Sequence, residues 1–223
     1  MRPNHAQPNA AATAPDRDDC DTAMNAPIVF HFDFSSPYGY IASEKIEALA
    51  ARHGRSVDWR PMLLGAVFKV AGTAPLTSVP LKGDYSRRDI ARSARFHGVP
   101  FHMPPRFPIA TQGPARIVVW QRGVDASATP RLVKALYRAY FVDGRDISDP
   151  EVAAEVAGET GVDLAAARTA IDDPAVKDAL KRDVDAAIAA GVFGSPYIVV
   201  DGEPFWGVDR LDQVDAWLER GGF

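Results

Sequence analysis

The stretch that decides the fold is Ile-Val-Phe-His-Phe-Asp-Phe-Ser-Ser-Pro-Tyr-Gly-Tyr at residues 28–40. Alternating side chains rich in Val, Ile and Phe predict a strand over residues 28–34. Two serines followed by a proline are typical of a helix start, and apolar residues at helical spacing continue to a stop signal at Gly54. A second strand is predicted over residues 57–62. The order strand, helix, strand favours parallel pairing through a right-handed crossover.

From residue 63 to residue 173 the pattern changes to helices separated by proline and glycine, without strand-like alternation. Helices are predicted over residues 66–70, 85–97, 114–121, 130–141, 150–157 and 164–171. A longer amphipathic helix at 174–190 then precedes two short strands and a last helix. The strands are predicted at 197–200 and 203–206, joined by a hairpin turn at Asp201-Gly202, and the helix is predicted at 208–219.

With the helical middle removed, the elements follow the thioredoxin order: strand, helix, strand, then helix, two strands and a helix. We therefore predict an α/β protein with a thioredoxin-like domain built from residues 26–63 and 174–223. Residues 64–173 are predicted to form an all-helical insertion domain.

Composition excludes several classes of function. The chain has 223 residues, of which 47% are hydrophobic and 24% charged, as in globular proteins. A net charge of −4 argues against broad binding to nucleic acid, and no apolar run is long enough to span a membrane. Cys20 is the single cysteine, so an intramolecular disulfide, a Cys-x-x-Cys centre and a multi-cysteine zinc site are excluded. The histidines lack metal-ligand spacing, and no metal is expected.

Residues 1–23 differ from the rest, because they contain no Val, Ile, Leu or aromatic residue. Such a segment buries too little apolar surface to offset the entropy of ordering it, so residues 1–25 are predicted to be a disordered leader. It also lacks the apolar core of a secretory signal, which predicts a cytoplasmic protein. Translation from Met1 and translation from Met24 both remain open.

Two positions in the predicted fold carry chemistry. Ser-Pro-Tyr-Gly at residues 36–39 stands where thioredoxin-like redox enzymes have Cys-Pro-x-Cys, which excludes dithiol exchange. The second position is Ser195-Pro196, just before the returning strand. The fold predicts a cis bond there, which leaves the backbone of Ser195 free to pair with an extended peptide.

A peptide groove without cysteine suggests a protein that binds a thiol. The Ser36 hydroxyl and the helix N-terminus would both stabilise a thiolate. Lowering a thiol pKa by about two units takes about 2.7 kcal/mol of preferential stabilisation. A charge-assisted hydrogen bond of about 1.5–3 kcal/mol, together with the helix end, covers that amount. Two simpler interpretations stay open: Ser36 as a plain helix cap, and Pro196 as an ordinary strand-entry proline.

Four separated motifs carry a resemblance to a known family. They are Phe-Asp-Phe-Ser-Ser-Pro-Tyr at 32–38, Arg-Pro-Met-Leu-Leu-Gly-Ala-Val-Phe-Lys at 60–69, Gly-Val-Phe-Gly-Ser-Pro at 191–196 and Phe-Trp-Gly-Val-Asp-Arg-Leu at 205–211. Over residues 27–220 the chain resembles the 2-hydroxychromene-2-carboxylate isomerase family, which belongs with kappa-class glutathione transferases and DsbA-like proteins. The resemblance implies the DsbA/kappa-class type of thioredoxin-like fold and glutathione as the cofactor.

The resemblance also implies roles for single residues. Ser36 would be the catalytic residue and contact the glutathione sulfur, while Ser195, before Pro196, would pair through its backbone with the cysteinyl part. The other glutathione-binding residues that it implies are Thr73, Lys82, Val208 and Asp209. Thr73 stands where relatives typically have asparagine, so it offers a hydroxyl but no amide.

Aromatic and basic side chains near these motifs are candidates for a substrate pocket. Tyr38, Tyr40 and Trp206 would line an apolar slot for an aromatic ring, although residues of this kind are also common in protein cores. Arg88 shares a face of the predicted helix 85–97 with two further arginines and would attract a substrate carboxylate. A solvated helix face is the alternative.

The reaction that the resemblance implies interconverts 2-hydroxychromene-2-carboxylate and trans-o-hydroxybenzylidenepyruvate, in the degradation of aromatic compounds. Reversible addition of the glutathione thiolate to a conjugated alkene would allow rotation about the former double bond. A kappa-class-like glutathione transferase and a non-catalytic thioredoxin-fold binding module remain as alternatives. Relatives are commonly dimers, so a homodimer is expected, with a small aromatic molecule as substrate.

Overall fold

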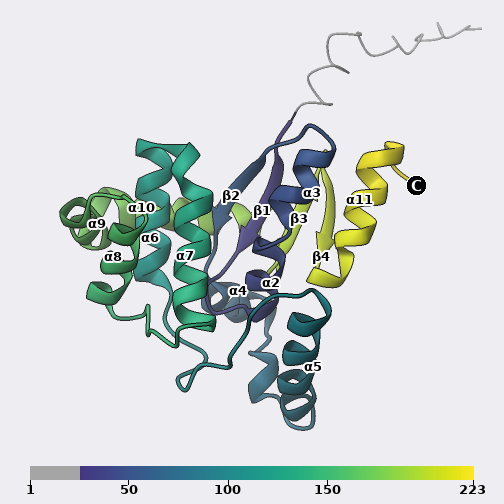
Figure 1. Cartoon of the computed structure of the whole chain (residues 1–223), viewed down its shortest axis with the longest axis horizontal. Coiled ribbons are helices and arrows are strands. Elements are labelled where there is room, and N and C mark those ends of the chain that lie inside the picture. Colours follow the sequence, from purple (N-terminus) through teal and green to yellow (C-terminus); the bar gives the residue numbers. More distant parts are fainter. Residues whose placement is uncertain (1–25) are drawn as a thin grey trace, which may run out of the picture.

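The computed structural model describes residues 26–223, so the predicted leader, Cys20 and Met24 lie outside the described residues. A four-stranded sheet forms the centre of the molecule, in the order β2-β1-β3-β4 (Figure 1). Its strands are β1 (Ile28–Phe32), β2 (Val57–Pro61), β3 (Tyr197–Val200) and β4 (Glu203–Trp206). β1 pairs in parallel with β2, whereas β3 runs antiparallel to β1 and β4 antiparallel to β3. This α/β arrangement is the predicted thioredoxin-like topology.

The helix predicted after β1 is divided into α2 (Pro37–Ser43) and α3 (Ile46–Arg52). This corrects the prediction of one continuous helix. The Ser43 hydroxyl donates a hydrogen bond to the Tyr40 carbonyl, and the Lys45 N–H bonds the carbonyl three residues back instead of four. Both bonds tighten the chain at the end of α2, so the helix is interrupted there.

Helices make up the segment between β2 and β3. They are α4 (Leu64–Ala71), the short η1 (Leu76–Ser78), α5 (Lys82–Phe96), α6 (Gln112–Val124), the short η2 (Ala126–Ala128), α7 (Thr129–Phe141), α8 (Pro150–Glu159), α9 (Leu164–Asp172) and α10 (Pro174–Ala189). After β4 the chain continues through η3 (Val208–Arg210) into α11 (Leu211–Arg220). In Figure 1, α6–α10 gather on one side of the sheet, α11 lies on the other side, and α5 lies apart at one end.

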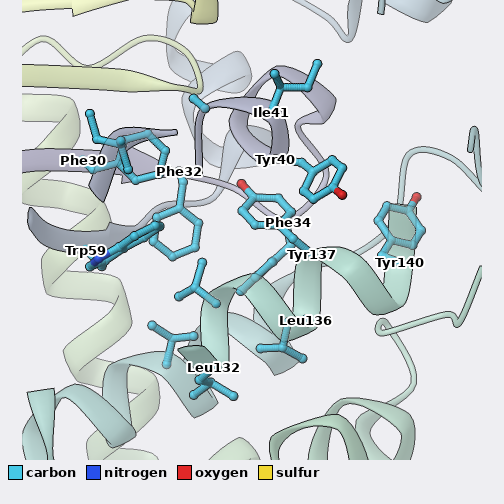
Figure 2. Packing of buried hydrophobic residues seen from close by; sticks show 14 of the residues in the cluster. Phe30, Phe32, Phe34, Tyr40, Ile41, Trp59, Leu132, Leu136, Tyr137 and Tyr140 are labelled. Carbon is cyan, nitrogen blue, oxygen red and sulfur yellow. The ribbon is translucent and has the colours of Figure 1, made fainter. Parts of the chain in front are cut away.

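One aromatic core joins the sheet to α7 (Figure 2). Phe30 and Phe32 of β1 are fully buried, because alternate residues of a strand point to the same face. The Phe32 ring lies 5.8 Å from Trp59 and 5.9 Å from Tyr137 of α7, and Phe34 lies 4.9 Å from Tyr137. Burying each such ring stabilises the fold by about 1.5–3 kcal/mol. The core therefore fixes α7 directly behind the end of β1, where α2 begins.

No helix within residues 26–223 combines the length and the apolar character needed to cross a bilayer.

Candidate active site at the start of helix α2

Ser36 caps the N-terminus of α2. Its backbone is extended, its side chain accepts a hydrogen bond of 3.0 Å from the Gly39 N–H, and Pro37 follows at the first helical position. Only 5% of the Ser36 surface is exposed. The helix cap that the sequence predicted is therefore present, and it fixes the position of the Ser36 hydroxyl at the N-terminus of α2.

The structure brings Ser36 against the segment that precedes β3. The peptide bond between Ser195 and Pro196 is cis, as expected. The Ser36 hydroxyl lies 2.8 Å from the Ser195 carbonyl oxygen. Because a carbonyl has no proton, the hydroxyl must be the donor in this hydrogen bond. The ladder between β1 and β3 begins only at Tyr197, so the Ser195 backbone lies beyond the sheet.

A buried carboxylate that the sequence analysis missed lies behind Ser36. Asp33 is 3% exposed, and its side chain accepts hydrogen bonds from the Ser35 N–H, the Leu64 N–H and the Thr111 hydroxyl. Burial raises the pKa of Asp33 from 3.8 to about 6, and the two backbone N–H donors limit the rise. The sequence did contain a signal for this residue, which is its position between Phe32 and Phe34. An acidic residue between two buried aromatic residues is unfavourable unless its carboxylate has hydrogen-bond partners.

Tyr137 of α7 is a second residue that the sequence analysis missed. Its hydroxyl donates a hydrogen bond of 2.9 Å to the Asp33 carbonyl, and the Ser195 hydroxyl accepts one of 3.1 Å from the Asp33 N–H. Burial raises the pKa of Tyr137 well above its usual value. An added Cβ at Gly39 would lie 2.7 Å from the Tyr137 hydroxyl and 2.8 Å from that of Ser195, so only glycine fits there.

The predicted substrate-pocket residues separate into two groups. Tyr40 is fully buried and donates a hydrogen bond to the Pro100 carbonyl, so it belongs to the core, which corrects its assignment to an apolar slot. Tyr38 is half-buried and donates a hydrogen bond of 2.5 Å to Asp89 of α5. Burial, together with Asp89, raises the pKa of Tyr38. Arg88 is an exposed residue on the same helix.

Trp206, the last residue of β4, lies beside the segment that contains the cis-proline. It is 53% exposed, and its ring packs edge-on against Phe193 at 4.8 Å. The indole closely covers Gly194, since an added Cβ there would overlap its nitrogen. The Gly207 N–H donates to the Pro196 carbonyl at 3.1 Å, which holds the end of β4 beside the same segment. Trp206 is thus an accessible aromatic surface next to Ser195.

The remaining predicted glutathione-binding residues lie around α4, α5 and η3. Val208 is buried and Asp209 exposed, and both line a pocket between η3, the start of α11 and the C-terminal part of α5. η3 itself packs against α2. Thr73 and Lys82 are exposed, one after α4 and the other at the first residue of α5. Within residues 26–223, no hydrogen bond links Thr73 or Lys82 to Ser36 or Ser195.

Over the described residues there is no cluster of three or more His, Cys, Asp or Glu side chains that could hold a metal ion. The site instead offers a buried hydroxyl, a main-chain carbonyl just before the start of β3 and an exposed indole. This arrangement suits binding of an extended, thiol-containing ligand, because a hydroxyl can donate to sulfur and a peptide can pair with the carbonyl.

Fold and site together define a thioredoxin-fold protein in which a serine stands in place of the redox cysteines. The chain belongs to the family of DsbA-like thioredoxin domains, whose family model matches residues 27–219.

Curated relatives of this chain include isomerases and glutathione transferases. A 2-hydroxychromene-2-carboxylate isomerase of Sphingobium xenophagum is 30% identical over 197 residues, which cover 87% of this chain and 99% of that protein. A protein named glutathione S-transferase kappa 2 from Caenorhabditis elegans is 30% identical over 210 residues, which cover 86% and 91%. Among solved structures, a 2-hydroxychromene-2-carboxylate isomerase superposes with a TM-score of 0.78 at 25% identity and covers 86% of this chain and 94% of its own.

Proposed function

We propose that this protein is a glutathione-dependent isomerase that interconverts 2-hydroxychromene-2-carboxylate and trans-o-hydroxybenzylidenepyruvate, or close analogues of them. The observation that carries the proposal is the Ser36 hydroxyl 2.8 Å from the Ser195 carbonyl, beside the cis bond to Pro196. The isomerase relative, which the chain matches along almost its whole length, supports the same reaction.

The residues of the site fit a thiol peptide. Glutathione would supply a thiolate that adds reversibly to a conjugated alkene. Ser36 would donate its hydroxyl proton in a hydrogen bond to the sulfur and favour the ionised form. Ser195 would pair through its main chain with the cysteinyl part, and the helical turn of Val208 and Asp209 would hold the γ-glutamyl end.

Five further residues complete the proposed site. Lys82 is an exposed cation at the start of α5 and would attract a carboxylate of glutathione, while Thr73 would contribute a hydroxyl. The exposed indole of Trp206 beside Ser195 would face the aromatic ring of the substrate. Tyr38 of α2, which is hydrogen-bonded to α5, and Arg88 of α5 would border the substrate on the side away from Trp206.

We also propose that the protein acts as a cytoplasmic homodimer in aromatic-compound degradation. Support for the dimer comes from large apolar side chains left exposed along α4, η1 and α5, a pattern common at protein interfaces. They are Val70, Leu76, Leu81, Tyr85 and Phe96. Light scattering on purified protein would give twice the mass of one chain, and a monomer would contradict this proposal.

Titration calorimetry with glutathione, followed by conversion of benzylidenepyruvate-type substrates, tests the main proposal. We expect wild type to bind and to isomerise, and Ser36→Ala to lose most of the catalysed rate. Binding without isomerisation, but with conjugation of haloarenes, would favour the second candidate, a kappa-class transferase, which the Caenorhabditis elegans relative supports. If glutathione does not bind, the chain is a non-catalytic binding module and the proposal is wrong.

A further inference from the structure

Asp33 is a buried acid that the proposed reaction does not use. It precedes Ser36 by three residues and is 3% exposed. Its two main-chain polar atoms and both carboxylate oxygens all take part in hydrogen bonds. Asp33 is part of the Phe-Asp-Phe-Ser-Ser-Pro-Tyr motif at 32–38, and its contacts in the fold indicate its role.

The carboxylate ties the turn before α2 to two other helices. Oδ1 accepts from the Ser35 N–H at 2.7 Å, which shapes the turn itself. Oδ2 accepts from the Leu64 N–H at 2.7 Å and from the Thr111 hydroxyl at 3.2 Å. Leu64 is the first residue of α4, and Thr111 is the residue before α6. These hydrogen bonds attach the N-terminal ends of two helices, both distant in sequence, to the turn that contains Ser36.

The main chain of Asp33 extends the same connections. Its N–H donates to the Ser195 hydroxyl at 3.1 Å, so it reaches the segment before β3. Its carbonyl accepts from the Tyr137 hydroxyl of α7 at 2.9 Å and from the Ser36 N–H at 2.8 Å. Segments from α4, the start of α6, α7 and the loop before β3 therefore meet at this one residue.

Keeping a carboxylate here has an energetic cost. Burial raises the pKa of Asp33 to about 6, which means that the ionised form is disfavoured in the folded protein. A neutral Asn would avoid this penalty, but its single oxygen can accept from only one of the two N–H donors on opposite sides. Acids retained against such a penalty are concentrated at functional sites.

We propose that Asp33 is a positioning residue for Ser36. Its carboxylate holds the serine turn against α4 and α6, so that the Ser36 hydroxyl points at the place where the sulfur of a bound thiol lies. This inference rests on the proposed function, because it assigns Asp33 to the same thiolate site. Asp33 acts through Ser36 and does not itself contact the ligand.

The test is the pKa of the glutathione thiol when it is bound to the protein, read from thiolate absorbance in the ultraviolet against pH. We expect Asp33→Asn to keep glutathione binding by calorimetry but to raise that pKa by about one unit, which is tenfold less thiolate well below the pKa. Thr111→Val removes one of the three hydrogen bonds to the carboxylate. It should raise the thiol pKa by a smaller amount, about 0.3 units or twofold.

Thr129→Val is the matched control for Thr111→Val. Thr129 is also a buried threonine, but it lies at the far end of α7 and its hydroxyl has no partner among the described residues. Its variant should leave the thiol pKa unchanged, whatever it does to thermal stability. A purely structural role for Asp33 would likewise change stability and leave the thiol pKa of the folded protein where it was.

The outcomes are distinguishable. If wild type does not bind glutathione, the proposed function and this inference both fail. If wild type binds it with a lowered thiol pKa and Asp33→Asn shows the same pKa, the inference is overturned while the function stands. Should Asp33→Asn not fold, Thr111→Val decides, and an unchanged thiol pKa in that variant overturns the inference.

Discussion

The Ser36 hydroxyl donates its only proton to the carbonyl oxygen of Ser195, 2.8 Å away. In the free protein this proton is therefore committed to the main chain. A thiolate is a stronger acceptor than a neutral carbonyl, because hydrogen bonds to charged groups contribute about 1.5–3 kcal/mol against about 1 kcal/mol. The Ser36 hydroxyl is thus expected to turn its hydrogen bond from the Ser195 carbonyl to a sulfur that binds beside it.

An analogue of glutathione that is methylated on the cysteinyl amide nitrogen tests this exchange. In bound glutathione, the cysteinyl N–H would donate a hydrogen bond to the Ser195 carbonyl once the Ser36 hydroxyl bonds to the sulfur. The methylated nitrogen has no proton and cannot donate this hydrogen bond. We expect the bound analogue to show a thiol pKa about 0.5–1 unit higher than bound glutathione, equal to the loss of about one neutral hydrogen bond. In Ser36→Ala the two ligands should show the same pKa, and equal values in wild type would contradict the exchange.

Removing the hydroxyl should also change stability without any ligand. Ser36→Ala leaves the Gly39 N–H without its cap and the Ser195 carbonyl without its donor, so the free energy of unfolding should fall by about 1–2 kcal/mol. Ser43→Ala is the control, because the Ser43 hydroxyl is buried at the other end of α2 and bonds only its own helix. Denaturant unfolding would measure the loss of stability in each variant. An equal loss in Ser36→Ala and Ser43→Ala would contradict the role of Ser36 as a cap.

Gly39 is predicted to be intolerant of any side chain. In Gly39→Ala the methyl group would lie 2.7 Å from the Tyr137 hydroxyl and 2.8 Å from that of Ser195, both of which are hydrogen-bonded to Asp33. Overpacking of this kind costs about 1–3 kcal/mol. Gly123→Ala in α6, where the new methyl group meets nothing within 4 Å, should instead be neutral or stabilising by up to about 1 kcal/mol. Thermal unfolding that ranks the two variants the other way would refute this prediction.

The pH dependence of stability should reveal the buried acid. Because the pKa of Asp33 is raised from 3.8 to about 6, its contribution to folding is fully present below pH 4 and is lost as the pH rises through 6. The free energy of unfolding of wild type, minus that of Asp33→Asn, should therefore fall by about 2.4 kcal/mol between pH 4 and pH 7.

Taking this difference removes the effect of His31, whose pKa is lowered to about 4 by burial and which titrates over the same range in both proteins. Denaturant unfolding at a series of pH values gives the two curves. A difference that stays flat with pH would show that Asp33 has an ordinary pKa in the folded protein.

Local sequence was sufficient for the order of the elements and for part of the site. Strand alternation in β1, the serine cap of α2 and the turn between β3 and β4 are short-range features, and each was predicted from neighbouring residues. The order of these elements identified the thioredoxin-like topology, which in turn predicted that the bond to Pro196 is cis. The hydrogen bond between Ser36 and Ser195 became known only from the folded structure.

Contacts between distant segments decided the rest. Tyr40 lies in the core, where its hydroxyl finds an acceptor in the Pro100 carbonyl, and this partner is 60 residues away in the chain. The hydrogen bonds to Asp33 come from Leu64, Thr111 and Tyr137, which are 31 to 104 residues distant. Periodicity reports only which side of an element is apolar. Which donors converge on one carboxylate is set by how the helices pack on the sheet, and that packing exists only in the folded chain.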